Sequence, residues 1–149
     1  MLDVPISRGQ LSKLVTRKVS AALREPYEEL LRRLPTQGRL NVDETGHKEN
    51  KRRMWAWCFR AEDFTVLRIA ETRSAQVLWD VLGREFQGVL GCDYFSAYRK
   101  YMRECNILVQ FCLAHLIRDL KFLTTLPNTD TAAYGQDVLD AVRELFHVF

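Results

Sequence analysis

The sequence contains no long apolar run and no targeting segment. None of its apolar stretches reaches the roughly eighteen residues that a transmembrane helix needs. The first six residues lack the basic and apolar regions of a signal peptide, and the chain has no internal repeat or low-complexity tract. With 149 residues, of which 47% are hydrophobic, the chain is expected to form one globular domain with a core and to make no membrane contact.

Cysteine is scarce and irregularly spaced. The four cysteines do not form a disulfide framework and indicate reduced, buried thiols in a cytoplasmic protein; they are Cys58, Cys92, Cys105 and Cys112. Cys112 and His115 have the spacing of a zinc-ligand pair. No second pair accompanies them, so a zinc site is not favoured.

Net charge is only +3, so composition alone does not indicate a nucleic-acid-binding protein. The basic residues nevertheless gather in two places. One group lies in the opening helix and is interpreted as a solvated face; it comprises Lys13, Arg17, Lys18 and Arg24. The other follows Asp43 and is expected to form a basic rim beside the acidic residues, where it binds DNA phosphates; it comprises Lys48, Lys51, Arg52 and Arg53.

Residues 7–34 have the apolar spacing of two helices. Ser7 and Gln10 form a capping box at the start of the first helix. Pro26 suits the first turn of a second helix, which Pro35 to Gly38 end.

The period then changes to that of strands. Residues 39–44, 53–60 and 64–70 are joined by short links and predict an antiparallel meander. Next come a helix that begins after Ser74 and ends at Gly83, further strands at 89–93 and 107–112, and three more helices. Since a crossover is right-handed, the fourth strand is expected beside the first. The fold class is therefore α/β, with a mixed five-stranded sheet flanked by helices and preceded by an N-terminal helix pair.

Two aspartates, Asp43 and Asp93, follow short apolar runs that read as the ends of neighbouring strands. A Gly at position 46 is expected to turn the chain after the first of them. Carboxylates so placed suit Mg²⁺ or Mn²⁺, which take hard oxygen ligands and complete their shells with water and phosphate. The alternative is that both are solvated turn residues. Glu44 is expected to face the opposite side of the sheet from Asp43.

Three motifs carry a family resemblance. They are Val42-Asp-Glu-Thr-Gly46, Leu90-Gly-Cys-Asp-Tyr-Phe-Ser-Ala-Tyr98 and Phe111-Cys-Leu-Ala-His-Leu-Ile-Arg-Asp119. In this order and spacing the chain resembles, over about residues 4–149, the transposases of the insertion-sequence sixty-six (IS-66) family. The resemblance implies a ribonuclease-H-like fold and a metal-dependent Asp-Asp-Glu centre. Such enzymes cut DNA at transposon ends and join the freed 3′ hydroxyl to target DNA.

Carried over by position, Asp43 is the first catalytic acid and metal ligand and Asp93 the second. The third acid, a Glu, is expected beyond Phe149, and Glu144 is not expected to replace it. The resemblance thus implies a helical segment at 1–38, an incomplete ribonuclease-H-like core at 39–126, and the start of a helical insertion at 127–149. A chain of this kind is expected to self-associate and, alone, to lack strand-transfer activity. Its expected place is the bacterial cytoplasm, in association with the nucleoid.

His115 and Arg118 belong to the third motif, and one interpretation is that both reach the scissile phosphate. The alternative is that His115 is a histidine at the start of a helix and Arg118 an exposed arginine. Two alternatives to a transposase remain open. One is a metal-dependent nuclease of similar fold that makes DNA or RNA ends without joining them. The other is a non-catalytic remnant that binds DNA or an intact transposase.

Overall fold

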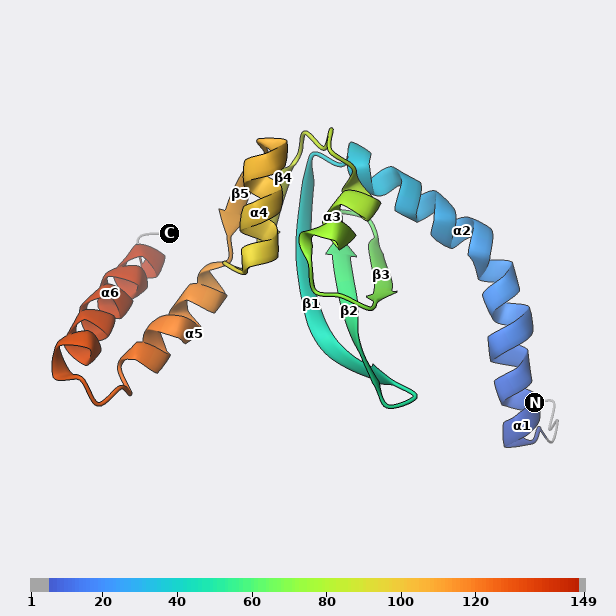
Figure 1. The fold of residues 1–149 in the computed structure, drawn as a ribbon, viewed down its shortest axis with the longest axis horizontal. Helices are drawn as coiled ribbons and strands as arrows, with labels where there is room; N and C mark the ends of the chain where they lie inside the picture. The colour runs from blue at the N-terminus through green and yellow to red at the C-terminus, as the bar shows by residue number, and fades with distance from the viewer. Residues whose placement is uncertain (1–5, 148–149) are drawn as a thin grey trace.

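A mixed five-stranded sheet forms the centre of the computed structural model, which describes residues 6–147 (Figure 1). The strand order across the sheet is β3-β2-β1-β4-β5. The strands are β1 (Arg39–Glu49), β2 (Arg52–Arg60), β3 (Thr65–Ala70), β4 (Val89–Cys92) and β5 (Leu108–Phe111). The prediction of five strands with the first in the middle and the fourth beside it is confirmed.

Strand directions follow from the connections. β1, β2 and β3 are joined by tight links and pair antiparallel, with Asp43 opposite Cys58. β4 returns through a helix and pairs parallel with β1, and β5 pairs parallel with β4. This is the ribonuclease-H-like sheet that the resemblance implies.

Two helices cover one face of the sheet: α3 (Ala75–Leu82) and α4 (Ser96–Cys105). Gly83 ends α3 with a φ of 72°, a left-handed conformation that favours glycine. Side chains of alternate strand residues point into this layer, so Leu40 and Val42 of β1 are buried while Asn41 and Asp43 between them are exposed. The largest buried side chains of this core are Trp57, Phe59, Phe86, Tyr98 and Tyr101.

The first strand is longer than predicted, and the expected turn at Gly46 is wrong. β1 extends to Glu49, and Gly46 pairs with Trp55 in the ladder. The turn consists of Asn50 and Lys51, both with positive φ (47° and 67°). This is the backbone of a two-residue hairpin turn whose twist matches that of the strands. Asp43 is consequently an interior residue of β1, although the parallel pairing of β1 with β4 ends at Asn41.

The N-terminal helices are joined without a break, so the predicted boundary at Pro26 is wrong. α1 (Arg8–Lys13), a π-helical segment η1 (Leu14–Val19) and α2 (Ser20–Arg33) follow directly on one another, and a short 3₁₀ turn η2 (Leu34–Thr36) ends them. The expected capping box at Ser7 and Gln10 is confirmed. Pro26 lies inside α2, where the helix is exposed and water can satisfy the carbonyl group that loses its amide partner.

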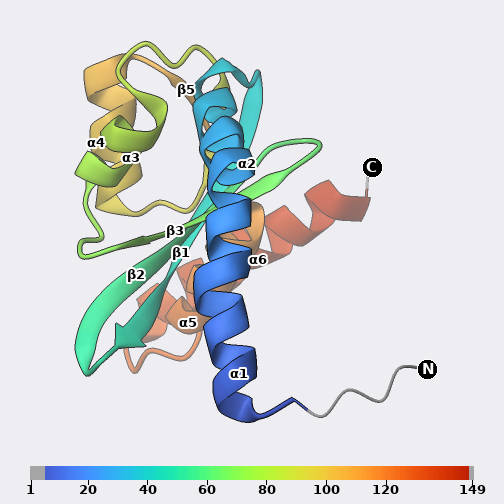
Figure 2. The same cartoon turned by 90° about the vertical axis from the view of Figure 1, so that its right-hand side faces the viewer.

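Two further helices, α5 (Leu113–Leu123) and α6 (Thr129–His147), form a helical hairpin at the other end of the sheet. Gly135 permits their close approach, because a Cβ atom there would lie 2.8 Å from Cβ of Leu123. None of the described helices is long and apolar enough to cross a membrane. In Figure 2 the continuous N-terminal helix extends well beyond the sheet.

Candidate active site

The sheet face opposite α3 and α4 carries a depression of about 460 Å³. Because strand residues alternate between faces, the polar residues of β1 and β2 that are not in the core line this depression. Its lining residues are Arg39, Asn41, Val42, Asp43, Cys58, Arg60, Gly91, Cys92, Asp93, Gln110, Phe111, Cys112, Leu113 and His115. We call it the sheet cavity.

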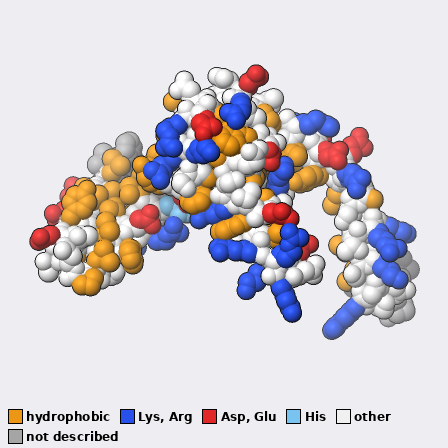
Figure 3. All heavy atoms as spheres, in the orientation of Figure 1, with side chains coloured by type: hydrophobic (Ala, Val, Ile, Leu, Met, Phe, Trp, Pro, Cys, Tyr) orange, Lys and Arg blue, Asp and Glu red, His pale blue; other side chains and the backbone are white. Residues whose placement is uncertain are grey.

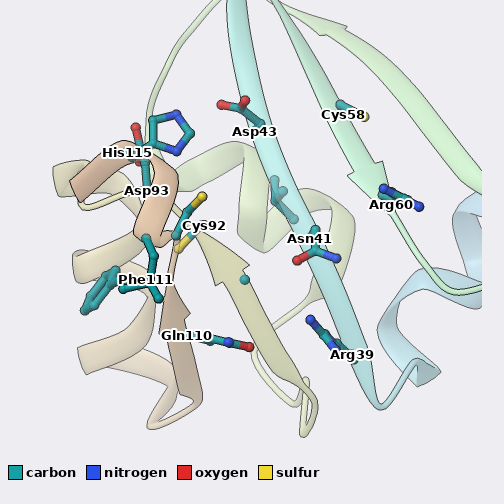
Figure 4. A pocket seen from close by; sticks show the side chains of 14 residues that line it. Arg39, Asn41, Asp43, Cys58, Arg60, Cys92, Asp93, Gln110, Phe111 and His115 are labelled. Atoms are coloured by element: carbon teal, nitrogen blue, oxygen red, sulfur yellow. The ribbon is translucent and has the colours of Figure 1, made fainter. Parts of the chain in front are cut away.

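Both predicted acids line the sheet cavity. Asp43 projects from β1, and its Oδ1 accepts a hydrogen bond from the backbone N–H of Glu44 at 2.9 Å. Asp93 follows β4 directly, and its Oδ1 accepts from the N–H of Phe95 at 2.9 Å. In Figure 4 the Asp43 carboxylate points toward the side of the cavity where Asp93 and His115 lie. The structure therefore brings together two carboxylates that are fifty residues apart in sequence.

A buried ion pair lies behind Asp93 on the other side of β1. The Glu44 side chain is fully buried and accepts hydrogen bonds from Nε of Arg73 and from the hydroxyl of Tyr98. Nη2 of Arg73 also lies 3.8 Å from Oδ2 of Asp93. The Arg73 guanidinium is stacked over the Phe95 ring, 3.7 Å from its centroid. Arg73 thus links the inward-facing acid of β1 to the acid that follows β4.

Burial governs the titration of this network. Desolvation raises the pKa of Glu44, against the opposing effects of its bonds to Tyr98 and Arg73. Desolvation, reinforced by the bond to Glu44, also raises the pKa of Tyr98, so its hydroxyl remains a donor. The position of Glu44 on the face opposite to Asp43 agrees with the strand alternation used above.

Cys92 and Cys112 line the sheet cavity, and their thiol pKa values are shifted in opposite directions. The backbone N–H of Cys112 donates to the carbonyl of Cys92 at 2.7 Å, which joins the ends of β4 and β5. Burial raises the pKa of the Cys92 thiol to about 12. The His115 side chain, and then the backbone N–H groups of His115 and Ala114, lower the pKa of the Cys112 thiol. No group of three or more His, Cys, Asp and Glu side chains suited to a metal occurs among residues 6–147, and zinc ligation by Cys112 and His115 gains no further ligand there.

His115 and Arg118, which the third motif suggested together, occupy different surroundings. His115 lines the sheet cavity, and its Nδ1 is buried without a hydrogen-bond partner among the residues described. Arg118 does not line the cavity; it is exposed on α5, with its Nε 3.8 Å from Oδ1 of Asp119. The structure therefore places His115, and not Arg118, beside the two acids.

The predicted basic rim lies on the β1–β2 hairpin, where Figure 3 shows Lys and Arg side chains gathered, and none of its four residues lines the sheet cavity with the two acids. Lys48 and Arg53 are paired across the two strands, and Lys51 is in the turn. Arg52 forms an ion pair with Glu71 at 2.8 Å, and the Arg53 guanidinium lies 4.8 Å from the centroid of the Trp55 ring. The two lysines are the rim residues most available to a ligand.

Sequence reasoning missed four polar residues that share the open face with Asp43: Arg39, Asn41, Arg60 and Gln110. Part of this polar face could have been predicted, because Arg39, Asn41 and Asp43 alternate with the apolar residues Leu40 and Val42 along β1. Asn41 lies close to β4, where a Cβ atom at Gly91 would be 2.4 Å from its Oδ1. The two arginines offset the charge of the two aspartates and give the cavity cationic groups within a few residues of the acids.

The donor set fits a divalent cation of the Mg²⁺ class. Asp43 and Asp93 supply hard carboxylate oxygens from rigid positions on or next to strands. Each accepts one backbone hydrogen bond through Oδ1, which fixes the carboxylate, and Oδ2 of Asp93 also lies 3.8 Å from Nη2 of Arg73. Two carboxylates leave most of the coordination shell to water and to substrate oxygens, as is usual for Mg²⁺.

Comparison with known proteins gives one match that covers the chain. The model of the family described as "Transposase IS66 family" matches residues 1–148. No curated protein sequence matches.

Three of the similar solved structures are of viral proteins. One is a chain of the simian T-cell lymphotropic virus intasome in complex with the PP2A regulatory subunit B56 gamma, at 10% identity and a TM-score of 0.41 over 66% of this chain. The present chain covers 46% of that chain, less than half its length. Two others are the HTLV-2 integrase catalytic core domain in complex with magnesium. The dimeric form has 10% identity, covers 68% of this chain and 83% of that one, and has a TM-score of 0.41. The trimeric form has 11% identity, covers 69% of this chain and 82% of that one, and has a TM-score of 0.41. At this similarity the viral structures carry no argument about the activity of the present chain.

Proposed function

The chain belongs to the IS66 family of transposases, and on that premise we propose that its sheet cavity is the centre for metal-dependent DNA strand cleavage and strand transfer. The observation that supports the proposal is that Asp43 and Asp93, from different strands, line one cavity on the open face of the sheet. In this proposal they are the first and second carboxylates of an Asp-Asp-Glu centre, and DNA is the substrate.

Asp43 and Asp93 would hold Mg²⁺ or Mn²⁺. The bound cation would supply Lewis-acid stabilisation of the attacking and leaving oxygens of an in-line phosphoryl transfer. The protein's own part is positional. The backbone N–H groups of Glu44 and Phe95 orient the two carboxylates, and Arg73 limits the movement of Asp93.

The cationic residues of the open face suit the DNA backbone. Arg39 and Arg60 line the cavity with the acids and would bind phosphates that flank the scissile one. His115 lines the cavity, and its imidazole would donate to or accept from a phosphate oxygen or a water. Lys48, Lys51, Arg52 and Arg53 would contact DNA further away, along the hairpin.

The proposed division of the chain follows its elements. In this proposal 1–38 is an N-terminal segment whose described part is helical, 39–126 is the ribonuclease-H-like core with the sheet and α3 to α5, and 127–149 is the start of an insertion whose described part contains α6. We place the activity at the bacterial nucleoid, in the cytoplasm, where transposon ends and target DNA are found.

Metal-dependent DNA binding tests the proposal. With a pre-nicked transposon-end duplex, the chain is expected to bind at least about tenfold more tightly in Mn²⁺ than in EDTA, since a cation held by the two carboxylates would offset their negative charge and attract phosphate. Asp43→Asn and Asp93→Asn are expected to remove this difference without weakening binding in EDTA, because they remove negative charge. Asp63→Asn, in the exposed β2–β3 link, is the matched control and should retain it. An Mn²⁺ effect that survives both active-site changes would contradict the proposal.

A strand-transfer assay tests whether the catalytic centre of this chain has a third carboxylate in addition to Asp43 and Asp93. Among residues 6–147 no third side chain joins Asp43 and Asp93 in a metal-binding group. We therefore expect no joined product when the 149-residue chain is incubated with Mg²⁺ or Mn²⁺ and the same duplex. Joined product that disappears in Asp43→Ala would show that the third ligand comes from within this chain or from a second copy. Metal-dependent binding without joining is also what the alternative, a non-catalytic transposase fragment that binds DNA, would give.

A further inference from the structure

The N-terminal helix extends beyond the sheet (Figures 1 and 2), and apolar side chains on this part of it are exposed. Four of them recur at every fourth position and are 41–56% exposed: Leu11, Val15, Val19 and Leu23. We call them the N-terminal stripe. Beyond Leu23 the same helix turns its apolar residues to the protein, where Leu30 and Leu31 pack against the core.

The π-helical segment η1 keeps the N-terminal stripe straight. In an uninterrupted α-helix the twelve residue steps from Leu11 to Leu23 would rotate by three turns and about a further 120°, which would spread the stripe around the helix. A π turn takes roughly one residue more than an α turn. With six of these residues in η1, the same span makes about three turns, so the four side chains lie on one side.

Charge around the N-terminal stripe is of one sign. No Asp or Glu occurs between Ile6 and Arg24, and Lys18 and Arg24 lie one position before or after members of the stripe. Lys13 and Arg17 lie two positions from the stripe, on the far side of the helix. The stripe is thus an apolar row with basic residues at its borders, and basic side chains are visible along this helix in Figure 3.

At the other end of the molecule α6 presents a second apolar row. Tyr134, Val138, Ala141 and Leu145 follow one another at spacings of four, three and four, which places them on one side of an α-helix. Tyr134 is 64% and Leu145 49% exposed. This C-terminal stripe differs from the side of α6 that packs on α5 through the buried residues Gly135 and Leu139.

The border of the C-terminal stripe is acidic. Asp130, Asp137 and Glu144 recur every seven residues, so they form a single row along α6. This row lies beside Tyr134, Ala141 and Leu145, since each acid is three or four residues from a member of the stripe. One helix therefore offers an apolar row with a basic border, and another an apolar row with an acidic border.

We propose that the N-terminal stripe of one chain packs against the C-terminal stripe of a second copy. The two helices lie at opposite ends of the sheet, so they do not meet within one chain (Figure 1). Pairing between copies covers both apolar rows and sets one basic border of the N-terminal stripe against the acidic row of α6. DNA would satisfy the basic residues but would leave the leucines and valines of the stripe exposed to water.

The contact is heterologous, since it joins two different surfaces of the chain. Two reciprocal contacts between the same pair of chains close a two-fold dimer, and an unreciprocated contact leads to longer assemblies. The proposal concerns assembly and does not depend on the activity proposed for the sheet cavity.

Reciprocal charge reversal tests the contact. The N-reversed chain carries Lys18→Glu and Arg24→Glu, and the C-reversed chain carries Asp137→Lys and Glu144→Lys. Sedimentation of the wild-type chain over a range of concentrations is expected to show self-association. Each reversed chain alone is expected to associate at least about tenfold more weakly, because like charges then face each other. An equimolar mixture of the two is expected to associate about as well as wild type, since both contacts in the mixed pair are again complementary.

A matched control is available on the same helix. Lys13→Glu with Arg17→Glu makes the same change of charge on the side of the helix away from the stripe and should leave association nearly unchanged. Circular dichroism verifies that every variant is folded. The proposal is overturned if the wild-type chain is monomeric at about 100 μM, or if the mixture does not associate. It is equally overturned if N-reversal leaves association intact and abolishes duplex DNA binding, a result that would assign the helix to DNA.

Discussion

Successive side chains of β1 point to opposite faces of the sheet, and this gives Asp43 and Glu44 different roles. Asp43 and Glu44 are neighbours in sequence, yet one lies in the open sheet cavity and the other is buried with Arg73 and Tyr98. The two carboxylates are adjacent in the sequence, but a strand directs neighbouring side chains to opposite faces of the sheet. The identity of the buried partner could not be predicted, because Arg73 lies in a link between β3 and α3 whose path no local pattern determines.

Removing Arg73 is expected to destabilise the fold in a pH-dependent manner. Arg73→Met leaves the Glu44 carboxylate buried without its cation, and we expect a loss of about 3 kcal/mol in the free energy of unfolding near pH 8. Glu44 has a folded-state pKa above its ordinary value, so its ionised form is the costly one, and the cost is relieved as the pH falls through that pKa. Without Arg73 this pKa rises further, and the loss should be smaller at pH 5 than at pH 8.

Urea unfolding at the two pH values measures the difference, and Arg118→Met, an exposed arginine on α5, is the control. The control should change stability by less than about 0.5 kcal/mol. An equal loss at pH 5 and pH 8 would contradict the role given to Glu44.

At the scale of elements, the β1–β2 hairpin turns at a different position from the one that its glycine predicts. Gly46 suggested a turn, but the aromatic strand β2 pairs with β1 past that glycine, as far as Glu49 opposite Arg52. The actual turn contains Asn50 and Lys51, and a lysine with positive φ is not a residue that sequence rules place there.

The hairpin turn offers a stabilising substitution. Lys51 has a φ of 67°, which costs a side-chain-bearing residue about 1 kcal/mol or more and costs glycine almost nothing. Lys51→Gly also creates Asn-Gly, the preferred pair for this turn. We expect thermal or urea unfolding to show a gain of about 1 kcal/mol. Lys48→Gly, in the strand beside the turn, serves as the comparison and should destabilise instead.

The same hairpin is expected to contact DNA phosphates through Lys48 and Lys51. Duplex affinity should fall steeply with salt, because each neutralised phosphate releases counterions. Replacing both lysines with alanine should reduce the slope of log affinity against log salt by up to about 1.8, or about 0.9 for each contact. Affinity that stays flat from low to physiological salt would show that the rim is only a solvated turn.

At the scale of the whole molecule, the arrangement of the sheet was largely predictable. Short links fix β1 to β3 as a meander, and the handedness of the crossover through α3 places β4 beside β1. The continuity of the N-terminal helix was less accessible, since Pro26 usually marks a helix start and here lies within α2. The open face was also missed, because its lining residues come from four strands and the start of α5, and no local window contains them.

The most direct test of this account is the binding of Mn²⁺ to the chain without DNA, measured by calorimetry or by electron paramagnetic resonance. If both Asp43 and Asp93 contribute to the site, Asp43→Asn and Asp93→Asn should each weaken binding by at least about tenfold. Asp63→Asn should bind as wild type does. Binding that is unchanged in either active-site variant, or no binding at millimolar Mn²⁺, would contradict the claim that the two aspartates form one metal site.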